Sequence, residues 1–290
     1  MGEHCCGHDG LIVHARQDPT QTTTLRKAFV SAMNKRFRAL RGKIRREVLE
    51  ADGFGLKANR GDFEFRRDAD KVAAFREWLQ GEIDGNVLER RPGMPRAENA
   101  RRMWASEYIR EAYQRGVQHS ASEMAAAGAA VADRWVEAAG QREIHTDRLG
   151  LLYTRAFDEL DGITQAMDQQ ISRTLAEGLA KGKSATDIAG AINDRVDKVG
   201  RHRAAMLART ETINAHAEAS LMSYEEAGVE GVRVRAEFST AGDDRVCDVC
   251  AALEGRTYRP EDAHGIIPVH PNCRCAFIPA IDDARGVELR

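Results

Sequence analysis

The sequence predicts an α+β protein, in which a mainly helical N-terminal part is followed by a helix-plus-small-β C-terminal module stapled by a structural metal site. Three observations support this fold class. Up to about residue 228, apolar residues recur three or four positions apart, which is the period of amphipathic helices. Beyond Gly228, apolar and polar residues alternate, as they do in strands. The same C-terminal part holds a close group of cysteine and histidine residues, whose side chains are typical metal ligands.

Length and composition limit the classes of protein to which the chain can belong. Its 290 residues, of which 42% are hydrophobic, are enough for a sizeable core and for two domains. No apolar run reaches about eighteen residues and no secretory signal pattern is present, so we expect no membrane contact and a reducing cytoplasm. There, clustered cysteines favour a metal over a disulfide. The net charge of -2 excludes a protein whose whole surface binds nucleic acid, so any such contact must be local.

Three regions are expected along the chain. Residues 1–24 are polar and predict a flexible tail, residues 25–140 a helical domain, and residues 141–290 a second domain whose β module spans about 229–282. Cys5 and Cys6 lie in the tail between two histidines, but adjacent cysteines cannot form a C-x2-C turn, and their role stays open.

Residues 25–50 predict the first helix, because seven apolar residues follow one another at helical spacing. Thr23 or Thr24 is suited to cap its N-terminus. The opposite face is basic and carries no acid. Such a face is often merely solvated, but it could also contact phosphate or an acidic protein groove. The candidate contact residues are Lys35, Arg36, Arg38, Arg41, Lys43, Arg45 and Arg46.

Further helices are expected in the rest of the N-terminal part. A short alternating strand at 62–65 precedes a helix at 68–83, and a third helix with an aromatic stripe ends near Gly116. At helical spacing such a stripe is most often core. Residues 121–140 are rich in alanine and predict a weakly fixed helix.

The second domain begins with helical patterns as well. A helix is expected over 145–177, a short one opens at the capping residue Ser184, and Gly200 separates it from a longer helix that ends before Gly228. A strand is then expected over 232–238, a short one before residue 258 and a closing edge strand over 276–279, with Pro279 suited to the edge.

The most specific motif consists of two ligand pairs in the β module, a C-x2-C at 247–250 and an H-x2-C at 270–273, followed by one more cysteine. Short turns of this kind each present two ligands to one tetrahedral zinc ion. Five candidates are available for four positions: Cys247, Cys250, His270, Cys273 and Cys275. We favour the first four, with Cys275 able to replace Cys273 or His270. A closed set of four protein ligands makes zinc structural rather than catalytic.

Other chemistry is weakly supported by the residues. A DNA-reading finger needs a basic helix after the second ligand pair, and none is predicted. Arg209 and Glu211 in one helix are interpreted as a structural ion pair tying this helix to the β module. The alternative is an enzyme in which Glu211 and His216 act in a cleft, although no nucleophile or phosphate loop accompanies them.

Four tracts together resemble the phage Mu protein F-like head morphogenesis family, also called minor head or minor capsid proteins. They are A-R-T-E-T at 208–212, D-D-R-V-C-D-V-C at 243–250, L-E-G at 253–255 and I-P-V-H-P-N-C-R-C at 267–275. The similarity is strongest over about 145–282. The combination of the R-T-E helix with the H-P-N-C-R-C tract is more specific than either alone.

The resemblance implies a structural role rather than an enzymatic one. Proteins of this family are present in few copies in tailed-phage heads, associate with the portal protein and other head proteins, and are linked to head morphogenesis and to the fate of packaged DNA. It therefore implies a location in the virion head near the portal vertex, and in the host cytoplasm during assembly. No small-molecule substrate is expected. Non-specific binding of packaged double-stranded DNA through the basic helix at 25–50 is an alternative role.

Overall fold

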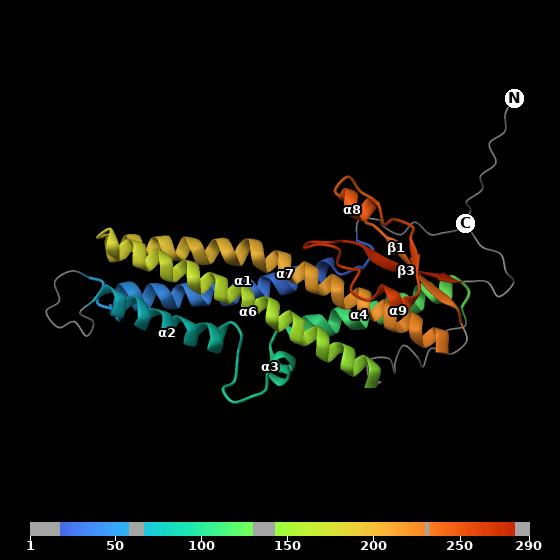
Figure 1. The fold of residues 1–290 in the computed structure, drawn as a ribbon, viewed down its shortest axis with the longest axis horizontal. Coiled ribbons are helices and arrows are strands. Elements are labelled where there is room, and N and C mark those ends of the chain that lie inside the picture. Colours follow the sequence, from blue (N-terminus) through green and yellow to red (C-terminus); the bar gives the residue numbers. More distant parts are fainter. Residues whose placement is uncertain (1–17, 58–66, 130–142, 230–231, 282–290) are drawn as a thin grey trace, which may run out of the picture.

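The computed structural model describes residues 18–57, 67–129, 143–229 and 232–281 (Figure 1). The expected strand at 62–65, most of the expected tail with Cys5 and Cys6, and much of the alanine-rich stretch at 121–140 lie outside these ranges. The end of the expected tail is within them. Thr20 and Thr22 are buried there, and the carboxylate of Asp18 accepts a hydrogen bond from the backbone N–H of Thr23 at 2.9 Å. The predicted cap at Thr23 or Thr24 is wrong, because the helix already begins at Thr23 and the carboxylate of Asp18 satisfies the first N–H group.

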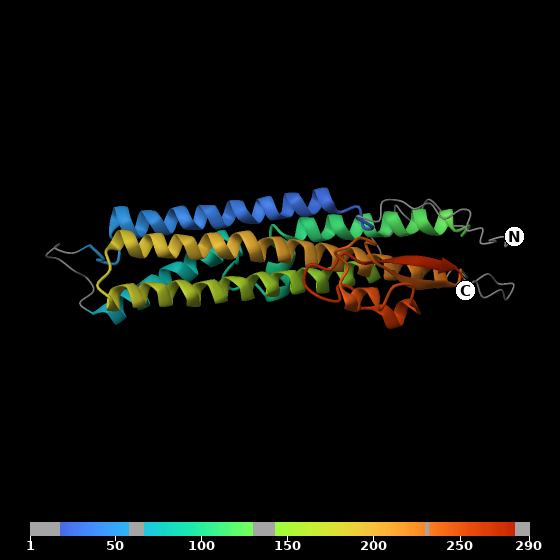
Figure 2. The same cartoon turned by 90° about the horizontal axis from the view of Figure 1, so that it is seen from above.

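Three long helices run side by side along the molecule (Figures 1 and 2). They are α1 (Thr23–Arg45), α6 (Glu143–Ala180) and α7 (Ala185–Val229). A π-helical turn, η1 (Arg46–Ala51), extends α1. Shorter helices pack beside them: α2 (Asp68–Asn86), α3 (Arg96–Arg102) and α4 (Ser106–Ala126). The predominance of helix that the apolar periodicity predicts is confirmed.

The apolar face of α1 is buried along its whole length, as its sequence spacing predicts. Phe29, Met33 and Leu40 are each 0% exposed. The aromatic stripe also belongs to the core, since the Tyr108 ring stacks on Phe29 with centroids 4.8 Å apart and Tyr113 is 0% exposed. Interior apolar contact of this kind is the main stabilising force in a helical bundle.

Two glycines that were expected to end helices lie inside them instead. Gly200 is part of the continuous α7, and Gly116 is part of α4. A Cβ at Gly200 would lie 3.3 Å from the Cβ of Phe37, and one at Gly116 would lie 2.6 Å from the backbone oxygen of His216. These positions therefore serve close helix packing, and the cost of about 1 kcal/mol for glycine inside a helix is tolerated. The predicted breaks at both glycines are wrong.

A small antiparallel sheet packs on the C-terminal half of α7 (Figure 1). Its strands are β1 (Val234–Ser239), β2 (Thr257–Tyr258) and β3 (Ala276–Ile281), in the order β2-β1-β3. Pro279 lies on the edge strand β3, as predicted. Two one-turn helices connect the strands, α8 (Asp248–Ala251) and α9 (Pro260–Ala263).

The β module has its own hydrophobic cluster, distinct from the core of the long helices. Phe238 of β1 and Phe277 of β3 meet Leu221 and Tyr224 of α7 there. The Tyr224 hydroxyl donates a hydrogen bond to the backbone oxygen of Phe277 at 3.3 Å. The α7 helix is therefore shared, because its first part belongs to the core of the long helices and its last turns belong to the β module.

Candidate metal centre

The two candidate ligand pairs lie in two separate loops of the β module, one at α8 and one just before β3. Cys247 is the N-cap of α8 and Cys250 lies within that helix, so one helical turn brings the two sulfurs to the same side. His270 and Cys273 lie in the loop that leads to β3, closed by a 3.1 Å hydrogen bond from Cys273 N–H to the oxygen of His270. Each pair is thus held by local backbone geometry, as the spacing predicts.

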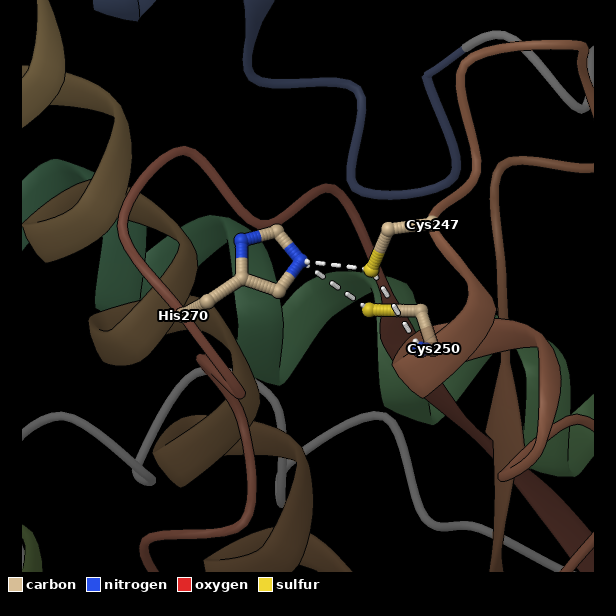
Figure 3. A group of neighbouring side chains, drawn as sticks. All are labelled: Cys247, Cys250 and His270. Carbon is tan, nitrogen blue, oxygen red and sulfur yellow. Dashed lines mark hydrogen bonds between the residues drawn. The ribbon is translucent and has the colours of Figure 1, made fainter.

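Figure 3 shows the imidazole of His270 pointing toward both sulfurs of the first pair. Its Nε2 atom lies 3.3 Å from Cys247 Sγ and 3.2 Å from Cys250 Sγ. Two ligands of one tetrahedral zinc, one sulfur and one nitrogen, are about 3.6 Å apart. The three donors therefore nearly have the spacing of ligands around one ion.

A second group of three donors shares Cys250 with the first. The sulfurs of Cys250, Cys273 and Cys275 lie within 4.8 Å of one another, as do the donor atoms of Cys247, Cys250 and His270. The five candidates thus form one continuous cluster centred on Cys250. Because Cys273 and Cys275 both contact Cys250, the cluster leaves the choice between them as fourth ligand open, and the favoured set stays a prediction.

The donor set suits a soft divalent cation on two grounds. His270 Nδ1 lies 2.8 Å from the backbone oxygen of Pro271. A proton on Nδ1 makes this hydrogen bond, and the lone pair of Nε2 is then directed at the two sulfurs, which is the tautomer that a zinc ligand requires. Moreover, thiols at this distance cannot all ionise without a cation between them.

The cysteine pKa values reflect this competition for negative charge. A hydrogen bond from Cys275 lowers the pKa of Cys273 to about 5. Burial and the neighbouring Cys273 raise the pKa of Cys250 to about 12. The pKa of Cys275 is also raised, by its hydrogen bond to Cys273 and by burial. Bound metal would remove this opposition, because coordination favours the thiolate of every ligand.

Arg274, which lies between Cys273 and Cys275, joins the two ligand loops. Arg274 donates to both carboxylate oxygens of Asp243, at 2.6 and 2.5 Å, and its side chain is only 16% exposed. The Arg274 and Arg245 hydrogen bonds hold the pKa of Asp243 below its usual range. This bidentate ion pair holds the turn before Cys247 against the loop that carries Cys273 and Cys275.

The predicted ion pair of Glu211 has a different partner. Glu211 is buried at 2% exposure and its carboxylate lies 3.1 Å from Nε of Arg155 in α6. Burial raises the pKa of Glu211, and Arg155 partly offsets this effect. The pair therefore joins two helices, so the interpretation of a pair between Arg209 and Glu211 that reaches the β module is wrong. Sequence alone could not assign the partner, which lies 56 positions away.

Glu211 and His216 do not meet in a common cleft. Glu211 faces α6, whereas His216 packs against α4, with its ring centroid 5.4 Å from that of His119. Burial lowers the pKa of His216 to about 3, so the ring is neutral. Their separation gives no support to the enzymatic alternative.

The basic face of α1 is less free than its sequence suggested. Arg36 pairs with Glu89 at 2.7 Å, Lys43 pairs with Glu82 at 2.6 Å, and Arg41 pairs with Asp197 of α7. Acids are absent from α1 itself, but α2, the segment that follows α2, and α7 supply them. Four of the candidate contact residues are exposed and have no ion-pair partner among the described residues: Lys35, Arg38, Arg45 and Arg46.

A histidine outside the sequence motifs holds the β module on α7. His264, just after α9, has Nδ1 2.7 Å from Glu218 and Nε2 2.7 Å from Glu225. Arg148 of α6 also reaches Glu218, at 3.3 Å. The two carboxylates raise the pKa of His264 to about 9. The seven-residue spacing of Glu218 and Glu225 on one helix face was the available signal, but their partner could not be read from it.

Comparison with known proteins gives one match. No curated protein and no solved structure matches the chain. None of the described helices combines the length and the apolar character that a membrane span needs. Residues 169–278, which include the whole of α7 and all five candidate metal ligands, match the family model described as "Phage Mu protein F like protein". The predicted resemblance is thereby confirmed for residues 169–278, which are similar to this family.

Proposed function

We propose that the chain is a structural minor head protein of a tailed phage or prophage, which associates with the portal and acts in head morphogenesis and in the handling of packaged DNA. The family match over residues 169–278 carries this proposal. The separation of Glu211 from His216 supports a non-enzymatic role. The site of action is the virion head near the portal vertex, and the host cytoplasm during assembly.

Within this role the long helices provide the docking surface and the β module is a rigid cap. We assign a structural zinc ion to the cap, held by Cys247, Cys250, His270 and Cys273, with Cys275 as the alternative fourth ligand. The shared position of Cys250 and the orientation of His270 Nε2 support this assignment. A structural zinc ion supplies on the order of 10 kcal/mol of folding free energy in modules of this kind.

Co-expression with the portal protein of the same phage tests the main proposal. The two proteins are expected to co-purify at a defined ratio, and Cys250→Ser is expected to leave this association largely intact if the helices make the contact. Purification of the two proteins as separate species under all salt conditions would contradict the portal assignment.

A second candidate function is non-specific binding of packaged DNA by α1. The exposed side chains of Lys35, Arg38, Arg45 and Arg46 favour it. Binding that involves phosphate contacts weakens steeply with salt, because counterions are released. A titration of duplex DNA at several salt concentrations is expected to show this dependence, and a flat dependence would assign the face to protein contacts.

A further inference from the structure

Three arginines from three parts of the chain lie near one another at the seam between α1, α7 and the loop before β3. Helices α1 and α7 are antiparallel, because Arg41 pairs with Asp197 while Phe37 lies opposite Gly200. Continuing this register by eleven positions places Arg26 of α1 level with about residue 211 of α7. Arg26 is therefore beside the turn of α7 that carries Arg209.

The third arginine is brought in by the metal-binding loop. The backbone N–H of Asn272 donates to Thr210 Oγ1 at 3.1 Å, which fixes the loop against the same turn of α7. Arg274 follows two residues later. In agreement with this geometry, burial lowers the pKa of Arg26, Asp18 opposes the shift, and the charges of Arg209 and Arg274 lower it further.

The positive charges at this seam exceed the negative ones. Arg26 pairs with Asp18 at 3.3 Å, and Arg274 pairs with Asp243 at 2.5 Å. Arg209 is half-buried, and among the described residues no carboxylate pairs with it. The nearest acid in sequence, Glu211, is engaged by Arg155. A half-buried guanidinium next to two others is unfavourable unless an anion joins them.

We propose that Arg209 is the centre of a phosphate-binding site, flanked by Arg26 and Arg274, and that the phosphate it takes is a phosphodiester of the DNA backbone. A guanidinium offers two parallel N–H donors that match two phosphate oxygens. The site deepens the second candidate function and rests on the binding of DNA by the chain, to which it adds an anchoring contact beside α1.

The exposed surface beside the seam favours a nucleic-acid backbone over a single carboxylate of a protein partner. Lys27, Arg38 and Arg45 are exposed on α1 and recur at spacings of eleven and seven, which places them along one line of the helix. The line is about 27 Å long. The regularly spaced phosphates of a nucleic acid can contact several cations along this line, whereas a single carboxylate would bind only at the seam.

The salt dependence of DNA binding tests the site in the full chain. The wild type is compared with Arg209→Gln and with Arg173→Gln, a matched control that removes one exposed arginine of α6. Arg209→Gln is expected to lower the slope of log K against log salt by about one phosphate contact, while the control leaves it unchanged. Equal slopes for both variants, or an affinity of the wild type that does not depend on salt, would overturn the proposal.

A triple variant separates this proposal from the one on which it rests. Replacing Lys27, Arg38 and Arg45 with Gln tests the α1 contact alone. If the triple variant loses salt dependence and Arg209→Gln does not, DNA binding by α1 stands and the seam site is wrong. If Arg209→Gln alone changes the slope, the seam site stands and the α1 contact is wrong.

Inorganic phosphate distinguishes the free anion from the DNA backbone and controls for folding. Thermal unfolding is followed with and without phosphate for the wild type, Arg209→Gln and Arg209→Lys. A larger increase in Tm for the wild type than for Arg209→Gln, together with the change in DNA slope, supports the site, and Arg209→Lys is expected to retain part of both effects. An equal increase in all three proteins would show that Arg209 binds no phosphate.

Discussion

The long helices and the β module are stabilised in different ways, although α7 belongs to both. Along α1, α6 and α7, large side chains such as Phe29, Met33 and Leu175 are fully buried, so apolar packing over a long seam holds these helices. In the β module, β2 is only two residues long. Three of the five candidate metal ligands, Cys250, Cys273 and Cys275, are part of its buried cluster.

The comparison shows what each region depends on. In the helical region the buried apolar side chains are the main source of stability, at roughly 25 cal/mol per Å2 of apolar surface removed from water. The β module has directional contacts in addition, namely the Arg274–Asp243 pair and the His264 contacts to α7, to which the proposed zinc ion would add its ligand bonds. Loss of one ligand should therefore affect the module and leave most of the helical structure in place.

The largest effect is expected for Cys250→Ser, because Cys250 belongs to both groups of donors. We expect the protein to lose its bound zinc, and the β module to lose stabilisation on the order of 10 kcal/mol. Metal analysis and hydrogen exchange check this result, with loss of protection in β1 and β3 and retained protection in α1 and α6. Val249→Ser, in the same turn and 60% exposed, is the control. Wild-type protein without metal, and equally stable variants, would refute the zinc assignment.

The next largest effect is expected in the helical region, for Gly116→Leu. Even a Cβ at this position would lie 2.6 Å from the backbone oxygen of His216, so α4 and α7 must separate. Overpacking of this kind costs about 1–3 kcal/mol or more. Denaturant unfolding measures the change, and the zinc content should stay unchanged. If the variant unfolds at the same denaturant concentration as the wild type, α4 and α7 are not in this close contact.

A smaller, pH-dependent effect is expected at the contact between the module and α7. His264 has a folded-state pKa raised to about 9 from an ordinary value of 6.5, by hydrogen bonds to Glu218 and Glu225, while Arg148 opposes the shift. The stabilisation from the charged imidazole is therefore complete below about pH 6.5 and is lost as the pH rises to about 9. Hydrogen exchange of the module across this range measures it, compared with His264→Gln. The same pH profile in both proteins would exclude His264 as the titrating group.

The smallest effect is expected for Gly190→Ala in α7, which should stabilise the protein. No atom lies within 4 Å of a Cβ built there, in contrast to Gly116 and Gly200. Alanine is favoured over glycine inside a helix by up to about 1 kcal/mol. A small rise in Tm checks this expectation, and a fall would indicate a contact that the helix makes in solution.

The sequence predicted the secondary structure well where a repeating pattern exists. The apolar spacing of α1 and α6 and the alternation in β1 gave the right elements, since local periodicity directly reflects which side of an element is buried. Glycine was misleading at positions 116 and 200, because the same residue can end a helix or allow a second helix to approach closely. The sequence alone does not distinguish these two uses.

In the candidate site, too, the sequence predicted the local features but not the contacts between distant residues. The pairing of Cys247 with Cys250 follows from spacing, because one helical turn closes it. The spacing also predicts a ligand pair of His270 and Cys273, but the structure groups His270 with Cys247 and Cys250, and Cys273 with Cys250 and Cys275. The ion pairs of Glu211, Arg41 and Lys43 were beyond reach of the sequence, because their partners come from other helices.

By itself, therefore, the sequence determined the helical periodicity, the small β module, the five candidate metal ligands and the likeness to a phage head family, which residues 169–278 bear out. Only the tertiary structure decided that Cys250 joins the two donor groups, that four cations of α1 pair with acids from elsewhere in the chain, and that none of the described carboxylates pairs with Arg209. The physical reason is that spacing along the chain fixes local geometry, whereas the balance of charge depends on which elements lie side by side.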